Sequence, residues 1–255
     1  MMQQEAGGGI WYFSGTGNSR AVARRLGERL GLEVKAVSEY DGARLDGSVG
    51  IVAPVYAWGI PGPVAGFAEV LSVAPDARVW CVLTCGDDTG CAPEVLEKIL
   101  RRSGIALRGV WSVQMPNIYV LLPGFDVDSR EVEQEKLRHS KERIDGIAAA
   151  IQAGRWGVDV VRGAMPRLKT ALVYPLFRRF GVRPRMWRVS DACISCGRCA
   201  EVCPQRNSRM TDGRPVWGAD CSGCLACYHV CPRHAIAYGT ATRGKGQYRT
   251  LLTDQ

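Results

Sequence analysis

A cysteine pattern that occurs twice constrains this chain more than any other feature of its sequence. Cys193-x2-Cys196-x2-Cys199-x3-Cys203-Pro204 returns 28 positions later as Cys221-x2-Cys224-x2-Cys227-x3-Cys231-Pro232. The two motifs hold eight of the 11 cysteines in a chain of 255 residues. Thiols spaced so regularly within one short segment predict metal-bound cysteines rather than a scaffold of disulfides.

Both motifs have the spacing of the bacterial iron–sulfur run, in which the fourth cysteine of each motif ligates the other 4Fe-4S cluster. Three thiolates on one tight loop can cap three irons of a cube, and the fourth comes from the short helix that follows. Zinc also takes four thiolates, but zinc sites rarely need two runs of this kind. Zinc and disulfides therefore remain the weaker alternatives.

Residues 187–240 closely resemble the two-cluster bacterial ferredoxins, which are small α+β domains. The resemblance implies which cysteines hold each cluster. Cluster I would take Cys193, Cys196, Cys199 and Cys231, and cluster II would take Cys221, Cys224, Cys227 and Cys203. Between the motifs, Asp212-Gly213 predicts a hairpin turn.

Residues 1–153 show a different pattern, in which apolar runs alternate with helical periodicity. Runs over 10–13, 49–55, 79–84 and 110–115 predict buried strands, with the last of these as the final strand. Helices are expected over 19–30, 93–102 and 129–153. Such alternation predicts an α/β fold with a doubly wound parallel sheet, which binds ligands beyond the carboxyl ends of its strands.

The first predicted strand leads into a small loop at a helix start. Its sequence is Ser14-Gly15-Thr16-Gly17-Asn18-Ser19, and backbone N–H groups at such a place can point at an anion. No Gly-Lys-Ser/Thr follows, and Arg20 stands where a dinucleotide fingerprint needs its third glycine. An uncharged cradle of this kind suits a phosphomonoester.

The loop resembles the phosphate loop of flavodoxins, which hold FMN, and two later segments extend the resemblance. It implies that Pro54-Val55-Tyr56-Ala57-Trp58-Gly59 covers one face of the flavin ring with Tyr56 or Trp58, and that Thr84-Cys85-Gly86-Asp87 wraps the ring edge. Asn117 and Tyr119 are candidates for the other face. Cys81 is expected to be a small buried residue, and Cys85 to line the flavin site.

Charge divides the chain into further segments. The formal net charge is +8, and most of the excess lies in a basic connector over 154–186 and in the residues after it. We expect the connector to pack as a helix that neutralises the cofactors, since each cluster with its thiolates carries about −2 and the FMN phosphate nearly as much. A membrane-surface or nucleic-acid-binding stretch is the alternative. Residues 241–255 form a C-terminal tail.

Location and partners are inferred from what the sequence lacks. Residues 47–68 carry no charge, but three prolines and five glycines argue against a membrane-spanning helix and favour a buried strand followed by a loop. No secretory signal is recognisable at the start. We therefore expect a cytoplasmic protein without a transmembrane segment, whose partners are redox proteins and not nucleic acid.

The pairing of the two parts resembles the flavodoxin–ferredoxin fusion proteins of anaerobic bacteria. The resemblance implies electron transfer between two 4Fe-4S clusters and FMN, a relay that couples one-electron to two-electron steps. A flavin-dependent oxidoreductase that reduces a quinone, a flavin or another small acceptor is the alternative. An iron–sulfur sensor that binds DNA through the connector is a third possibility, but no recognition-helix pattern supports it.

Overall fold

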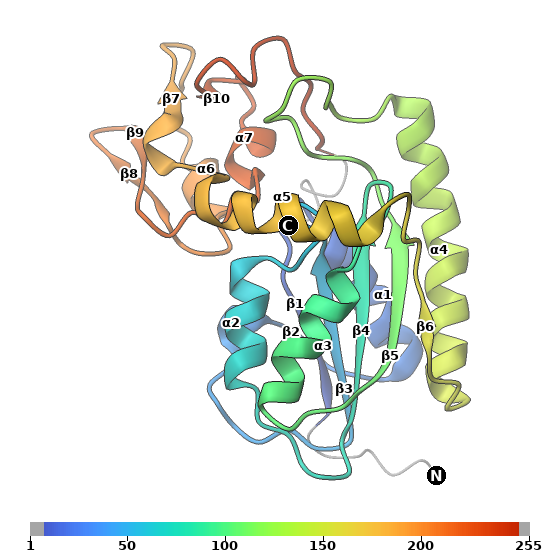
Figure 1. Ribbon diagram of the computed structural model, residues 1–255. Coiled ribbons are helices and arrows are strands. Elements are labelled where there is room, and N and C mark those ends of the chain that lie inside the picture. Colours follow the sequence, from blue (N-terminus) through green and yellow to red (C-terminus); the bar gives the residue numbers. More distant parts are fainter. Residues whose placement is uncertain (1–7, 250–255) are drawn as a thin grey trace.

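The computed structural model describes residues 8–249. A parallel six-stranded sheet forms the centre of the N-terminal part, with the strand order β2-β1-β3-β4-β5-β6 (Figure 1). The strands are β1 (Gly9–Tyr12), β2 (Val34–Ala36), β3 (Ser48–Pro54), β4 (Arg78–Cys85), β5 (Leu107–Gln114) and β6 (Val158–Asp159). The order of the first five strands is that of flavodoxin-like folds, so the predicted fold class is confirmed.

Four helices cover the two faces of this sheet. Helices α2 and α3 lie in front of it in Figure 1, and α1 and α4 pack against each other on the opposite face. Their bounds are α1 (Asn18–Leu30), α2 (Gly62–Val70), α3 (Ala92–Arg102) and α4 (Arg130–Gln152), with a 3-10 turn at Val37–Glu39. Each face has its own apolar core, which explains why the central strands read as continuous apolar runs.

Two expectations for this part need correction. The run over 110–115 is not the final strand, because Val158–Asp159 pairs with β5 as a short further strand. The uncharged segment after β3 is not only a loop, because α2 occupies Gly62–Val70. Pro63 stands in the first turn of this helix, where a missing N–H costs no hydrogen bond.

Helix α5 (Pro166–Phe180) runs across the molecule between the sheet and the C-terminal elements (Figure 1). Two of its side chains, Thr170 and Tyr174, are buried. The Tyr174 hydroxyl donates to the carbonyl of Ile60 at 2.7 Å, and Thr170 Oγ1 donates to the carbonyl of Trp58 at 2.9 Å. These contacts hold α5 against the loop that follows β3.

The C-terminal part contains two small antiparallel sheets and two short helices. Its elements are a 3-10 turn (Pro184–Met186), β7 (Trp187–Val189), α6 (Arg198–Glu201), β8 (Ser208–Thr211), β9 (Arg214–Trp217), α7 (Ala226–Val230) and β10 (Ile236–Tyr238). β7 pairs with β10 and β8 with β9. Asp212 and Gly213 turn the second hairpin with φ of 48° and 75°, as the sequence predicts.

The cysteine repeat is also a repeat of backbone conformation. Ser195 and Gly197 in the first motif have φ of 54° and 77°, and the equivalent Gly223 and Leu225 in the second have φ of 71° and 63°. Each motif therefore turns twice through the left-handed region before its short helix starts. Among residues 8–249, no helix is long and apolar enough to cross a membrane.

Candidate functional site

A cavity of about 220 Å³ opens beyond the carboxyl ends of β1, β3, β4 and β5. Its lining includes residues from all three loops expected to hold the flavin. These are Ser14, Gly15, Thr16, Asn18 and Ser19, then Pro54, Val55, Tyr56, Ala57 and Trp58, and finally Thr84, Cys85, Gly86 and Asp87. The cavity lies at the point where the strand order reverses between β1 and β3, which is the ligand position in doubly wound sheets.

The remaining two predicted residues stand behind the lining. Gly17 is the residue before α1, has a φ of 94°, and donates its N–H to Ser14 Oγ at 3.1 Å. Gly59 lies against the ring of Tyr174, where an added Cβ would come within 2.3 Å of ring carbons. Both glycines shape the loops that line the cavity.

The loop before α1 is fixed by hydrogen bonds to neighbouring strand ends. Ser19 Oγ and Thr84 Oγ1 lie 2.8 Å apart, and Asn18 Nδ2 donates to the carbonyl of Pro116 at 2.9 Å. The first turn of α1 contains no acidic residue. Its leading backbone N–H groups have no partner within the helix, so this end of the cavity suits a phosphate group.

Two aromatic residues after β3 line the cavity, and each contacts α5. Tyr56 lies edge-on to Phe177 of α5, with ring centroids 6.3 Å apart. Burial raises the pKa of Tyr56 well above its usual value, so its ring remains neutral. Trp58 lies under Lys169, whose Nζ is 4.9 Å from the ring centroid, and it takes a left-handed backbone with φ of 61°.

Two cysteines of β4, Cys81 and Cys85, stay protonated at neutral pH. Cys81 and Cys85 are buried. Burial raises the pKa of the Cys81 thiol, and it raises the pKa of Cys85 to about 12, with Asp88 and Asp87 adding to the effect. Both side chains therefore stay protonated and act as small apolar groups.

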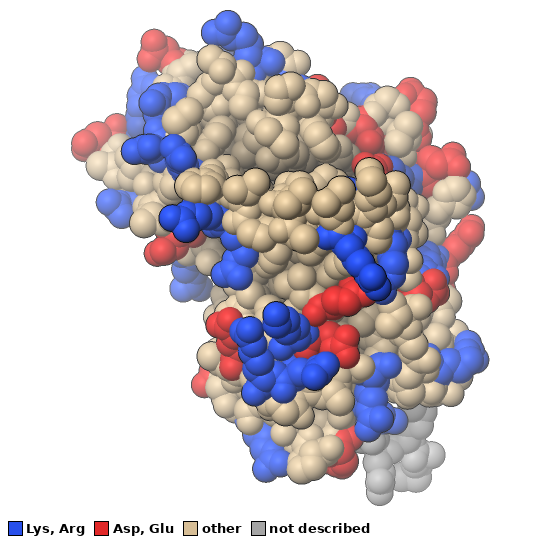
Figure 2. All heavy atoms as spheres, viewed as in Figure 1, with Lys and Arg blue, Asp and Glu red and all other residues tan. Residues whose placement is uncertain are grey.

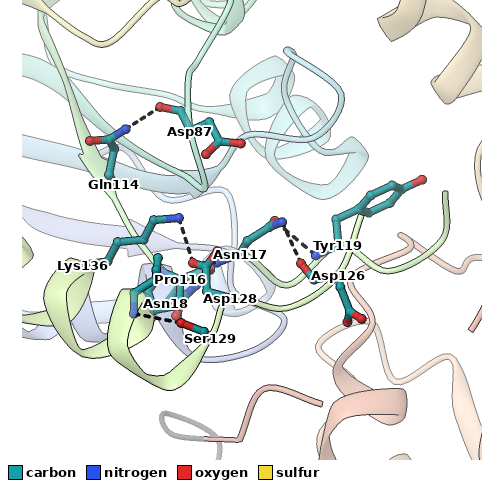
Figure 3. Close-up of polar contacts among 11 residues, drawn as sticks. Asn18, Asp87, Gln114, Pro116, Asn117, Tyr119, Asp126, Asp128, Ser129 and Lys136 are labelled. Atoms are coloured by element: carbon teal, nitrogen blue, oxygen red, sulfur yellow. Dashed lines mark hydrogen bonds and ion pairs between the residues drawn. The ribbon is translucent and has the colours of Figure 1, made fainter. Parts of the chain in front are cut away.

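The loop after β5 forms a wall of the cavity that the sequence indicated only in part. Asn117 and Tyr119 line it, as do Leu122 and Phe125. Asn117 N–H donates to Asp128 Oδ2 at 2.9 Å and its Nδ2 to the carbonyl of Asp126 at 3.0 Å (Figure 3). A polar network thus folds the loop back on itself beside the cavity.

The same network attaches the loop to α4, and a separate hydrogen bond joins the end of β5 to the loop after β4. Lys136 Nζ donates to Asp128 Oδ2 at 2.8 Å, and both side chains are mostly buried. Gln114 Nε2 donates to the carbonyl of Asp87 at 2.7 Å (Figure 3). This wall is therefore held at several points.

The other side of this loop belongs to the core of the C-terminal part. Val120 and Leu121 are buried in a cluster with Trp187, Leu225 and Tyr228. Sequence patterns did not reveal this, because an irregular loop has no periodicity to indicate which of its residues are buried.

A buried histidine reinforces this junction. His229 Nδ1 accepts the N–H of Tyr248 at 3.0 Å, and its Nε2 lies 2.9 Å from the carbonyl of Ile118. Burial lowers the pKa of His229 to about 4. The ring is therefore neutral at pH 7 and connects the wall of the cavity, α7 and the C-terminal segment.

The eight motif cysteines gather around two further, smaller cavities. One is lined by Cys193, Cys196, Cys199 and Cys231, and the other by Cys203, Cys221, Cys224 and Cys227. Backbone N–H groups already reach two sulfurs, from Asn207 to Cys203 at 3.3 Å and from Ala235 to Cys231 at 3.2 Å. Within residues 8–249, no three His, Cys, Asp or Glu side chains converge as ligands of a single metal ion.

The second cysteine cavity has features that a cluster would satisfy. Trp187 and Trp217 line it with stacked rings 5.6 Å apart, and their buried indole N–H groups lack a hydrogen-bond partner among the described residues. Each faces a thiol, Trp187 that of Cys221 and Trp217 that of Cys227. Burial raises the pKa of Cys224 to about 12, so a thiolate there requires a metal in place of the proton. These donors and thiols fit an iron–sulfur cluster.

The second cysteine cavity and the larger cavity are direct neighbours. A Cβ added to Gly15 would lie 2.6 Å from both the Cβ and the carbonyl oxygen of Cys224, and Gly223 lines the larger cavity. Cys224 is also part of the apolar core that contains Phe13 and contacts Tyr56. The first cysteine cavity lies at the surface, with Cys196 exposed and Ile194 58% exposed.

Comparison with known proteins identifies one region of the chain. Residues 192–236 match the 4Fe-4S dicluster domain family, so the chain contains an iron–sulfur domain of the kind that serves electron transfer. No curated protein matches the chain.

Two solved structures resemble part of the chain at low similarity. One is the rubredoxin oxygen:oxidoreductase of the anaerobe Desulfovibrio gigas, with 19% identity, a TM-score of 0.36 and coverage of 57% of this chain and 36% of that one. The other is an FMN-dependent NADH-azoreductase from Bacillus anthracis in complex with FMN. It has 10% identity, a TM-score of 0.38 and coverage of 56% of this chain and 98% of that one.

Proposed function

We propose that this protein transfers electrons between two 4Fe-4S clusters and one FMN, and that it couples one-electron to two-electron steps. Cluster I would be held by Cys193, Cys196, Cys199 and Cys231, and cluster II by Cys203, Cys221, Cys224 and Cys227. FMN would occupy the larger cavity, with its phosphate at the Ser14–Ser19 loop. The clusters would supply single electrons, and the flavin would store one or two.

One observation carries this proposal, namely the contact between Gly15 and Cys224. The loop suited to a phosphate touches a cysteine of the second motif, so a flavin and cluster II would be neighbours. Cluster I would lie farther out, beneath the exposed Ile194. This arrangement favours a linear order in which a redox partner protein meets cluster I and cluster II stands next to FMN.

Cofactor analysis after anaerobic purification tests the composition. We expect about eight iron, about eight sulfide and about one FMN per chain. Zinc in place of iron after anaerobic reconstitution would contradict the assignment of both clusters.

A double substitution in the phosphate loop tests the flavin site. Ser14→Ala with Thr16→Ala removes two hydroxyls, and that of Ser14 also holds the Gly17 N–H. At roughly 1.5–3 kcal/mol for each hydrogen bond to a charged group, FMN should bind about two orders of magnitude more weakly. Iron content should stay unchanged. Wild-type FMN affinity in this variant would show that the phosphate lies elsewhere.

A second function is favoured by the mouth of the larger cavity. Leu122 and Phe125 line it and are 49% and 38% exposed, which suits an apolar acceptor such as a quinone that meets the flavin edge directly. Steady-state turnover of small acceptors with a chemical reductant separates the two functions. Fast turnover without a protein partner supports an oxidoreductase, and its absence supports the relay.

A further inference from the structure

Helix α5 exposes a continuous apolar stripe on its outer side. Leu168, Leu172, Leu176 and Phe180 follow each other at intervals of four and are 52%, 58%, 59% and 50% exposed. We call these four residues the α5 stripe. Because its members lie close to one line along the helix, they form a ridge and not scattered surface residues.

The outer side of α5 offers only apolar contact and positive charge. The helix contains no acidic residue, and its two hydroxyl side chains, Thr170 and Tyr174, face inward and are already hydrogen-bonded. Figure 2 shows this face as a band without charge, with Lys and Arg at its ends. Protein interfaces use about one hydrogen bond per 100–200 Å², and the α5 stripe has no neutral polar group to supply one.

Arginines lie at the C-terminal end of the stripe, where Arg179 and Arg183 stand over the ring of Phe180 at 5.5 and 6.0 Å from its centroid. Arg167, Arg178, Arg179, Arg183 and Arg185 form no ion pair with any residue in the described part of the chain. Lys169 differs, because it is paired with Asp88 at 2.7 Å on the inner side. An apolar ridge with arginines at its end is complementary to a surface that is apolar inside and negative outside.

From this ridge and its charges we propose that α5 lies on the surface of a membrane that contains anionic lipids. The α5 stripe enters the boundary between headgroups and acyl chains, and the arginines contact the acidic headgroups. A second copy of the chain is a poorer occupant, because two α5 helices brought together would oppose arginines to arginines. The helix would place the mouth of the larger cavity beside the lipid, since Val173 and Phe177 of α5 line that cavity.

Vesicle flotation of the full chain with its cofactors tests this proposal. The protein should float with vesicles that contain phosphatidylglycerol. With vesicles of phosphatidylcholine alone, it should remain in the bottom fraction. Binding should weaken strongly at an ionic strength of about 1 M, where the Debye length is about 3 Å. Leu172→Gln with Leu176→Gln should lower the partition coefficient by more than about tenfold. Arg179→Gln with Arg183→Gln should lower it by about fivefold per residue.

Matched substitutions on other helices provide the controls. Val70→Gln at the end of α2 changes an apolar side chain that is 64% exposed, and Arg101→Gln with Arg102→Gln removes two exposed cations from α3. All of these variants should keep wild-type partition, and cofactor absorbance should show that every variant is folded.

Two results would overturn the proposal. One is an absence of binding to anionic vesicles, or binding that the α5 and control variants weaken equally. The other is a dimer in solution that Leu172→Gln with Leu176→Gln converts to a monomer, because a second copy would then be what covers the stripe.

Discussion

Trp187 and Trp217 are the residues best placed to set the properties of the proposed cluster II. Both bury their indole N–H groups beside Cys221 and Cys227 without another partner among the described residues. Hydrogen bonds to the sulfurs of an iron–sulfur cluster stabilise its more negative, reduced state. The cavity of the proposed cluster I has no tryptophan in its lining, so the two proposed clusters should differ in potential.

Replacing either tryptophan by phenylalanine removes the donor and keeps an aromatic ring. Trp187→Phe and Trp217→Phe should each make the reduction potential of cluster II more negative. A tenfold change in the equilibrium constant corresponds to about 59 mV for one electron, and we expect a shift of roughly that size. Potentiometric titration followed by electron paramagnetic resonance measures it.

Trp11 provides the control, because its indole N–H is also buried without a partner in the described structure but lies in the core beside Phe67. Trp11→Phe should leave both cluster potentials unchanged. An equal shift in all three variants would mean that the indole N–H groups do not act on the cluster.

Gly15 determines how closely the two proposed cofactor sites approach each other. Gly15→Ala should force the phosphate loop away from Cys224, because the added Cβ would meet its Cβ and carbonyl oxygen at 2.6 Å. Such overpacking costs about 1–3 kcal/mol, and FMN affinity should fall with it. Thermal unfolding and flavin titration measure both effects.

Gly66→Ala in α2 is the matched change, because no atom beyond its chain neighbours and the adjoining helix backbone lies within 4 Å of its added Cβ. It should leave FMN affinity unchanged and increase stability by about 0.5–1 kcal/mol. If Gly15→Ala behaves like Gly66→Ala, the two loops are not in tight contact.

At the scale of residues, the sequence predicted those parts of the sites whose residues are contiguous in the chain. The cysteine motifs and the Ser14–Ser19 loop are contiguous, so their spacing is visible without the fold. Leu122, Phe125 and Phe177 reach the larger cavity from segments that have no local signature. Their contribution arises only when the chain brings distant segments together.

Among the elements, α5 shows why the spacing of apolar residues does not always tell which side of a helix is buried. The expected packing helix exists, but α5 buries only two side chains and leaves its apolar stripe exposed. Its inner and outer sides both contain apolar residues, so periodicity could not indicate which side faces the protein. Gly59 determines which side of α5 faces the protein, because the ring of Tyr174 packs directly against this small residue.

Tyr174→Phe tests how α5 is attached. The substitution keeps the ring against Gly59 and removes the 2.7 Å hydrogen bond to the carbonyl of Ile60. An unpaired buried carbonyl costs about 1–3 kcal/mol, so the free energy of unfolding should decrease by about that amount in chemical denaturation. Leu168→Ala on the exposed side should change it by less than about 0.5 kcal/mol. Equal effects would show that the inner contacts do not anchor the helix.

The molecule as a whole is more integrated than a chain of two independent domains. Cys224 and Ala226 of the second motif belong to the same apolar core as β3 and β4, while Val120 and Leu121 after β5 belong to the core of the C-terminal part. The periodicity of a sequence identifies helices and strands one at a time. It cannot show that each part contributes side chains to the apolar core of the other.

Because the two parts share core residues, loss of the proposed cluster II should weaken binding of the proposed flavin. Cys221→Ser should remove cluster II and loosen the loop that carries Cys224, so FMN should bind at least about tenfold more weakly in a fluorescence titration. Cys193→Ser should remove cluster I and leave FMN affinity close to the wild-type value, because that site lies away from the cavity. Equal FMN affinity in both variants would mean that the flavin site is independent of the clusters.

The contact between Gly15 and Cys224 also has a kinetic consequence. Separate flavin and iron–sulfur carriers must collide before each transfer, so their rates depend on concentration, viscosity and ionic strength. In this chain the two loops already touch, and the transfer between them would be a first-order step. Its rate should stay constant on dilution, and only the encounter with an outside partner would respond to the composition of the solution.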